Sequence, residues 1–140
     1  MVYVDTSVLV ALYTKELNST GVAHWYASCT EELVSAVWCV SEFASALGIK
    51  QRTGQISAAE GQAAWIQFER MCANDLQLLP IEPGTFHRAA VLTLDAASGL
   101  RAGDALHLAV ALATKAKSIA TLDDVLAKNA KRMKLKQTKI

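Results

Sequence analysis

The stretch Val2-Tyr3-Val4-Asp5-Thr6-Ser7-Val8-Leu9 decides the fold of this chain. It begins with three apolar residues, two of them β-branched, which is typical of a short buried strand. Asp5, Thr6 and Ser7 follow at once, and such residues are favoured where a helix begins. A buried strand that passes directly into a helix predicts a βα unit.

Short apolar runs and helical stretches alternate in the same way to the end of the chain. Further strands are predicted at 33–37, 77–81, 118–121 and 134–140. Helices are predicted at 8–14, 19–30, 38–52, 58–74, 83–97, 103–115 and 123–132. Segment 103–115 is apolar in nearly every helical direction, so this helix should be buried on most sides. Right-handed βα crossovers build a parallel sheet with helices on both faces, and we predict an α/β fold.

Length and composition bound the class of protein. With 140 residues, 52% hydrophobic and 19% charged, the chain fits one globular domain spanning 1–140 and does not fit a disordered class. Cys29, Cys39 and Cys72 match no zinc or disulfide spacing, so we expect free thiols. The chain opens without a basic and apolar leader, and its densest apolar run, 108–113, is too short to span a bilayer. We therefore expect a soluble cytoplasmic protein without a membrane partner.

The charge is balanced overall but unevenly distributed. A formal net charge of +1 argues, taken alone, against a strongly basic nucleic-acid binder. Residues 1–114 carry six basic and eleven acidic side chains, however, whereas residues 115–140 carry eight basic and two acidic ones. Lys128, Lys131 and Arg132 recur at helical spacing within this basic segment. The segment is equally compatible with a solvated face that guards an edge strand and with a track for an RNA backbone.

Carboxylates follow several of the predicted strands. Asp5 ends the first strand, Glu42 lies shortly after the second, Asp104 begins the most apolar helix, and Asp123 follows the fourth strand. Each one alone fits a helix N-terminus, which favours acidic side chains. Together they would repel one another at one sheet edge unless a cation neutralised them. Because Mg²⁺ and Mn²⁺ prefer oxygen ligands and leave positions open for phosphate, the pattern predicts a metal-dependent phosphoryl-transfer site.

The chain resembles the PIN-domain ribonucleases, in particular the small VapC-like toxins of type II toxin-antitoxin systems. The resemblance covers essentially the whole chain and is carried by four motifs in order. They are Val4-Asp5-Thr6-Ser7-Val8-Leu9, Ser41-Glu42-Phe43, Leu100-Arg101-Ala102-Gly103-Asp104-Ala105-Leu106-His107 and Thr121-Leu122-Asp123. It implies a five-stranded parallel sheet in a three-layer α/β/α sandwich.

The same resemblance implies a function and a site. It implies hydrolysis of RNA phosphodiesters by metal-activated water, which leaves a 5'-phosphate and a 3'-hydroxyl, with Mg²⁺ or Mn²⁺ as cofactor. Asp5 and Asp104 would be the most direct metal ligands. Glu42 would hold metal through water or orient the attacking water, and Asp123 would complete the quartet. The number of ions, one or two, stays open.

Several neighbouring residues have more than one interpretation. Asp124 competes with Asp123 for the fourth position, since adjacent helical residues diverge by about 100°. Thr6 and Thr121 are candidates to support a ligating carboxylate, and Thr6 is also a candidate helix cap. Arg101 is a candidate to balance the carboxylates or to contact an RNA phosphate, and is equally compatible with a plain surface residue. His107 lies one turn after Asp104 and could face the same site, but a packed histidine with a hydrogen-bonded nitrogen is the favoured interpretation.

The resemblance also implies partners. A cognate small antitoxin protein would cover apolar grooves and block the site, RNA would be the substrate, and a homodimer would form. Leu12, Tyr13 and Trp25 are candidate interface residues, although core packing explains them equally well.

Three other functions are compatible with an α/β fold that carries acids at its strand ends. A haloacid-dehalogenase-like phosphatase would carry a second Asp at position 7, where this chain has Ser7. A receiver domain would end its third strand in an Asp, which the run Pro80-Ile81-Glu82 does not supply. A catalytically weak PIN-like module that only binds RNA or a partner is the principal alternative, and the intact quartet argues against it.

Overall fold

The computed structural model describes residues 1–140 and contains a five-stranded parallel sheet with the strand order β3-β2-β1-β4-β5. The strands are β1 (Val2–Val4), β2 (Leu33–Ala36), β3 (Leu76–Leu79), β4 (Ser118–Ala120) and β5 (Lys136–Gln137). The α-helices are α1 (Thr6–Tyr13), α2 (Ser19–Ser28), α3 (Trp38–Arg52), α4 (Ala58–Asn74), α5 (Pro83–Leu94), α6 (Ala102–Ala113) and α7 (Asp124–Arg132). The predicted α/β class and parallel sheet are confirmed.

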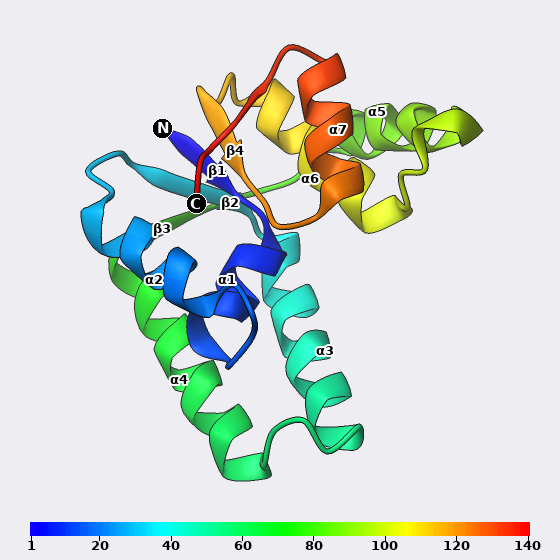
Figure 1. Ribbon diagram of the computed structural model, residues 1–140. Helices are drawn as coiled ribbons and strands as arrows, with labels where there is room; N and C mark the ends of the chain where they lie inside the picture. The colour runs from blue at the N-terminus through cyan, green and yellow to red at the C-terminus, as the bar shows by residue number, and fades with distance from the viewer.

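The sheet separates two hydrophobic cores of 16 buried residues each. Along β1, Val2 and Val4 enter one core while Tyr3 enters the other, as the two-residue period of a strand requires. Helices α1 to α4 lie on the first side of the strands, and α5, α6 and α7 lie on the second (Figure 1). The three-layer arrangement is therefore present, with β1 at the centre of the sheet.

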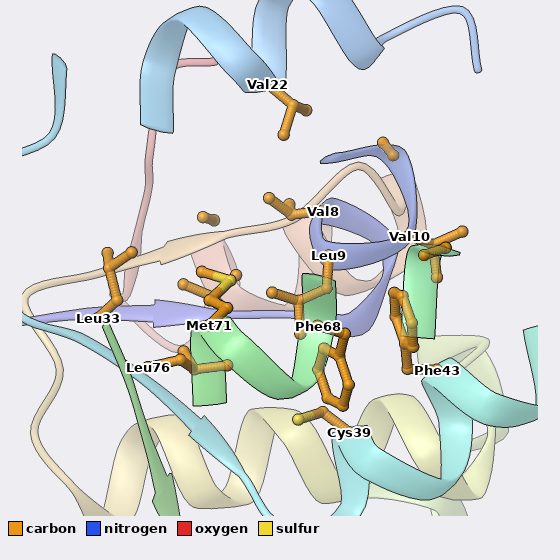
Figure 2. Close-up of a cluster of buried hydrophobic side chains, with 14 of the residues drawn as sticks. Val8, Leu9, Val10, Val22, Leu33, Cys39, Phe43, Phe68, Met71 and Leu76 are labelled. Atoms are coloured by element: carbon orange, nitrogen blue, oxygen red, sulfur yellow. The ribbon is translucent and has the colours of Figure 1, made fainter. Parts of the chain in front are cut away.

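Aromatic stacking anchors the first core. The rings of Phe43 and Phe68 stack at 13° with centroids 4.2 Å apart, and this pair joins α3 to α4. Val8 and Leu9 on α1 pack between this pair and Val22 on α2 (Figure 2). Full burial of a side chain of this size contributes about 1.5–3 kcal/mol. The helix that carries Glu42 is thus fixed by its apolar face against α1 and α4.

Helix α6 is the most buried helix of the second core. Seven consecutive residues, from Ala105 to Ala111, are buried, which confirms the expectation from its apolar sequence. The helix packs against α5 along its length. Its N-terminal turn emerges at the sheet edge where β1 and β4 end, and this turn carries Asp104.

Most element boundaries lie within two residues of those predicted, and two elements differ by more. The strand predicted at 134–140 is limited to Lys136–Gln137, because its only neighbour, β4, is three residues long and pairs through Ser118 and Ile119 alone. The helix predicted to run to residue 97 ends at Leu94. A 3₁₀ turn, Ala96–Ser98, follows Asp95 and is stopped by Gly99 at a φ of 69°, a conformation that favours glycine.

Two further expectations concern the chain as a whole. All three cysteines are free, as predicted. None of the helices has the length and apolar character needed to cross a membrane.

Candidate active site

Asp5 occupies the centre of the site because β1 ends there. It is 4% exposed and its Oδ2 accepts hydrogen bonds from Ser7 Oγ at 2.6 Å and from Thr121 Oγ1 at 2.9 Å. Asp5 is also the N-cap residue of α1. The capping interpretation is therefore confirmed for Asp5, and the same carboxylate also lines the cleft described below.

Glu42 reaches the same place from the second turn of α3. Its Oε1 accepts a hydrogen bond of 2.9 Å from Thr6 Oγ1 and another from His107 Nε2. Burial raises the pKa of Glu42, but the hydrogen bond and charge of His107 and the Thr6 bond outweigh it, so this pKa lies below its ordinary value. Glu42 is consequently held as a carboxylate in the absence of any cation.

Asp104 lies in the first turn of α6. Burial raises its pKa, the charges of Asp123 and Asp5 raise it further, and Arg101 opposes the shift. Burial and the nearby charges of Asp123 and Asp5 thus both make the ionised form of Asp104 less favourable. Arg101 itself is the exposed N-cap residue of α6 and influences Asp104 through its charge.

Asp123 is the N-cap residue of α7, and its Oδ1 accepts a hydrogen bond of 2.7 Å from the backbone N–H of Leu126. Its own backbone N–H donates to Thr121 Oγ1 at 3.0 Å, which links it to Asp5 through one hydroxyl. Asp124 is exposed and does not line the cleft, whereas Asp123 does. The geometry thus places Asp123, and not its neighbour, beside the other acids.

All four predicted acids line a single open cleft of about 460 Å³. Thr6 and Ser7 also line the cleft. Glu16 and Asn18 line it too and were not anticipated from the sequence. These two follow α1 in an irregular segment, so no periodicity pointed to them. The structure therefore brings the quartet together from β1, α3, α6 and the β4–α7 turn.

The donor set suits a hard divalent cation with a mostly aqueous shell. The side chains do not close into a group of three His, Cys, Asp or Glu ligands around one point. Mg²⁺ commonly binds through one or two carboxylates, keeps several waters and takes up substrate phosphate oxygens. Four carboxylates around an open cleft, with the pKa of Asp104 raised by its neighbours, fit that mode and do not fit an all-protein cage.

Ser7, His107 and Tyr3 support the site through hydrogen bonds and were not identified in that role from the sequence. Ser7 donates to Asp5 and accepts the backbone N–H of Leu122 at 3.0 Å. His107 is fully buried, as predicted, but its partners are Tyr3 and the site residues Thr6 and Glu42. The spacing of three residues from Asp104 was the one available signal for His107, since it places both on one side of α6.

An acidic cleft at the carboxyl edge of a doubly wound parallel sheet is where α/β proteins place their ligand sites. The sequence of the chain also matches a protein family directly. Residues 2–132 match the model of the PIN domain family, and the chain belongs to that family. No curated protein matches the chain at a significant level.

Solved structures share the fold at low sequence identity. VapC20 of Mycobacterium tuberculosis, described as a Sarcin-Ricin loop cleaving toxin, is 14% identical with a TM-score of 0.76, covering 92% of this chain and 95% of that one. FitAcB of Neisseria gonorrhoeae is 18% identical with a TM-score of 0.67 and coverages of 99% and 97%. VapBC2 of Rickettsia felis, bound to a DNA fragment from its promoter, is 15% identical with a TM-score of 0.63 and coverages of 99% and 98%.

Proposed function

We propose that this PIN-domain protein is a metal-dependent endoribonuclease that acts as the toxin of a toxin-antitoxin pair. The observation that carries the proposal is the convergence of Asp5, Glu42, Asp104 and Asp123 on one open cleft. Four acids gathered at one place destabilise the fold unless they bind a cation. A cleft open to solvent also leaves room for the backbone of an unpaired RNA strand.

In this proposal each acid has its own role. Asp5 and Asp104 hold Mg²⁺ or Mn²⁺ directly, Glu42 holds it through water or orients the attacking water, and Asp123 completes the site. When bound, the metal supplies activation of water near neutral pH and offsets charge on the scissile phosphate. Ser7 and Thr121 keep the carboxylate of Asp5 in one orientation by donating to the same oxygen.

The basic flank is proposed to guide the RNA backbone. Lys128, Lys131 and Arg132 are exposed on α7, the helix that begins at the cleft next to Asp123. Arg132 is partly engaged, because its guanidinium lies 3.6 Å from Asp95. Phosphate contacts of this kind make binding strongly salt-dependent without fixing the base sequence.

The proposed partners are a small antitoxin protein and a second copy of the chain. Support comes from neighbours of the same fold, among them a toxin-antitoxin complex from Klebsiella pneumoniae. A basic side chain of the antitoxin would find a complementary surface in the acidic cleft. Leu12, Tyr13 and Trp25, named above as interface candidates, are half-buried and pack against the first core, which favours the packing role for them. No helix could carry the chain across a membrane, and we propose that it acts in the cytoplasm.

The phosphatase alternative has little support. It needs an acid at position 7, and the Ser7 hydroxyl found there is bonded both to Asp5 and to the backbone of Leu122. The alternative of a module that binds RNA without cleaving it would use the same cleft. The experiment below distinguishes it from the nuclease.

The test incubates total RNA with the purified wild type and with Asp104→Asn, each in Mg²⁺, in Mn²⁺ and in EDTA. We expect cleavage by the wild type in either metal, with 5'-phosphate and 3'-hydroxyl ends, and none in EDTA or by the variant. RNA that is bound but left intact under all conditions would establish the binding module instead. Mapping of the cleaved ends would also give the target RNA.

A further inference from the structure

A chain of hydrogen bonds runs beneath the cleft through the fully buried His107. On one side, Tyr3 Oη lies 2.7 Å from His107 Nδ1. On the other side, His107 Nε2 contacts Glu42 Oε1 and lies 3.1 Å from Thr6 Oγ1. The chain thus links β1, α6, α1 and α3, and none of its members is left without a partner.

The carboxylate of Glu42 fixes one hydrogen of the imidazole. A carboxylate oxygen only accepts, so the contact between Glu42 Oε1 and His107 Nε2 requires a hydrogen on Nε2. In the neutral ring Nδ1 then accepts from Tyr3 Oη, whose oxygen also accepts the backbone N–H of Ala36 at 3.1 Å. A charged ring carries a hydrogen on Nε2 as well. In both forms, therefore, Nε2 donates toward Glu42.

We infer that His107, oriented by Tyr3, is a positioning residue that fixes the carboxylate of Glu42 against Asp5 and Asp104. His107 lies one turn after Asp104 on α6, and its Nε2 is also 3.6 Å from Asp5 Oδ1. The ring spans the two cores, since Tyr3 and α6 belong to the second and α3 belongs to the first. It is the side chain that couples the α3 acid to the α6 acid.

This role has a physical reason in the packing of α3. Its apolar side, with Cys39, Phe43 and Leu47, anchors the helix in the first core but leaves the side chain of Glu42 with several rotatable bonds. Without His107, neutral donors alone would hold Glu42: the hydroxyl of Thr6, which bonds Oε1 at 2.9 Å, and the side chain of Trp38. A buried, rigid donor on the same oxygen removes that rotational freedom, and support of this kind is worth about 10- to 100-fold in metal affinity or activity.

The inference rests on the proposed function and is tested with substitutions that separate donor loss from structural damage. His107→Gln places an amide N–H near the position of Nε2 and keeps a donor, whereas His107→Leu removes it. Tyr3→Phe removes the hydroxyl that contacts Nδ1 and orients the ring. His87→Leu, at an exposed histidine of α5, is the matched control. Thermal unfolding of each variant identifies losses that come from the fold.

Two readouts are measured, Mn²⁺ affinity by titration of the metal alone, and kcat and KM for RNA cleavage. We expect His107→Leu to weaken Mn²⁺ binding or lower kcat by about 10- to 100-fold, with KM little changed. His107→Gln should retain most of the wild-type Mn²⁺ affinity and kcat. Tyr3→Phe should give values between those of the His107→Gln and His107→Leu variants, and His87→Leu should match the wild type. Nitrogen NMR of the wild-type imidazole should show a hydrogen on Nε2.

The results that would contradict the positioning role of His107 differ from those that would contradict the proposed nuclease function. Equal losses in the Gln and Leu variants, no loss in either, or an unprotonated Nε2 would each contradict the positioning role. A wild type that cleaves no RNA would contradict the proposed function. The Mn²⁺ affinities of the Gln and Leu variants would still decide the role of His107 in that case.

Discussion

The hydroxyl of Thr121 donates a hydrogen bond of 2.9 Å to Oδ2 of Asp5 across 116 positions of the chain. The two residues follow neighbouring parallel strands, and Val4 of β1 lies opposite Ala120 of β4 in the register. The same hydroxyl accepts the backbone N–H of Asp123. One side chain therefore ties together the two acids that stand at the ends of β1 and β4.

Thr121→Val should lower activity without unfolding the chain. The substitution keeps the shape of a 2% exposed side chain and removes the donor to a buried carboxylate. Hydrogen bonds to charged groups contribute about 1.5–3 kcal/mol to stability, and lost support of a metal-binding carboxylate costs about 10- to 100-fold in activity. Urea unfolding and RNA cleavage measure the two effects. Thr53→Val, at an exposed helix end, is the control, and equal behaviour of the two variants would contradict this account.

Asp123→Asn and Asp124→Asn form a matched pair. Asn at position 123 retains an oxygen that caps α7 but removes the charge that faces the cleft, so we expect loss of RNA cleavage with little change in stability. Asp124→Asn removes an exposed charge outside the cleft and should leave cleavage near the wild-type rate. The two variants are compared by their rates of RNA cleavage at the same metal concentration. A larger loss at position 124 would reverse the assignment.

Asp104→Asn should stabilise the metal-free protein. Burial and the charges of Asp123 and Asp5 raise the pKa of Asp104, so its ionised form is less favourable in the folded chain than in the unfolded chain. This penalty is present above the raised pKa and disappears as the pH falls through it. Thermal unfolding in EDTA should therefore show a higher Tm for the variant at neutral pH, and the difference should shrink toward acid pH. A lower Tm for the variant at neutral pH would contradict the repulsion.

Addition of Mg²⁺ should make the wild type more stable than Asp104→Asn, the reverse of the order expected in EDTA. A cation that binds the folded chain alone raises its stability by mass action, and it also removes the repulsion among the acids. The Tm of the wild type should rise with Mg²⁺ concentration, while that of Asp104→Asn should rise less. The same scan with the larger monovalent ion K⁺ at matched ionic strength is the control. Equal shifts in wild type and variant would show that the quartet does not bind the ion.

Cys39 should resist alkylation in the folded protein. Burial raises the pKa of its thiol to about 12, and the residue is 0% exposed within the first core. The thiolate is the reactive form, so iodoacetamide at neutral pH should leave Cys39 unmodified until the chain unfolds. Mass spectrometry of native and urea-unfolded samples measures this. Rapid native labelling of Cys39 would contradict the packing of α3 against the first core.

The fold could be predicted from the sequence because its strands and helices alternate in local patterns. The apolar runs at 2–4 and 118–121 predict β1 and β4 almost to the residue, since β-branched residues are bounded there by polar ones. The C-terminal strand was predicted too long because its length depends on its partner β4, which local composition does not reveal. The 3₁₀ turn after Leu94 likewise depends on the backbone conformation of Asp95 and Gly99.

The acids of the cleft could be predicted because the carboxyl ends of parallel strands share one edge. The hydrogen bonds that support them could not be. Ser7 was noted only as a departure from another family, and Tyr3 only as a strand residue. Ser7 bonds the backbone of a residue 115 positions away, and Tyr3 bonds residues 33 and 104 positions away. His107 was expected to be packed, and the contact with Glu42 across 65 positions is visible only in three dimensions.

The four acids are proposed to act together, through a divalent cation, to cleave RNA. The decisive experiment follows a labelled RNA incubated with the wild type in Mg²⁺, in EDTA and in EDTA with excess Mg²⁺ restored, beside folded Asp5→Asn. We expect cleavage in Mg²⁺, none in EDTA, recovery when Mg²⁺ is restored, and none by the variant. Cleavage that persists in EDTA, or in Asp5→Asn, would contradict the joint action of the acids through a cation.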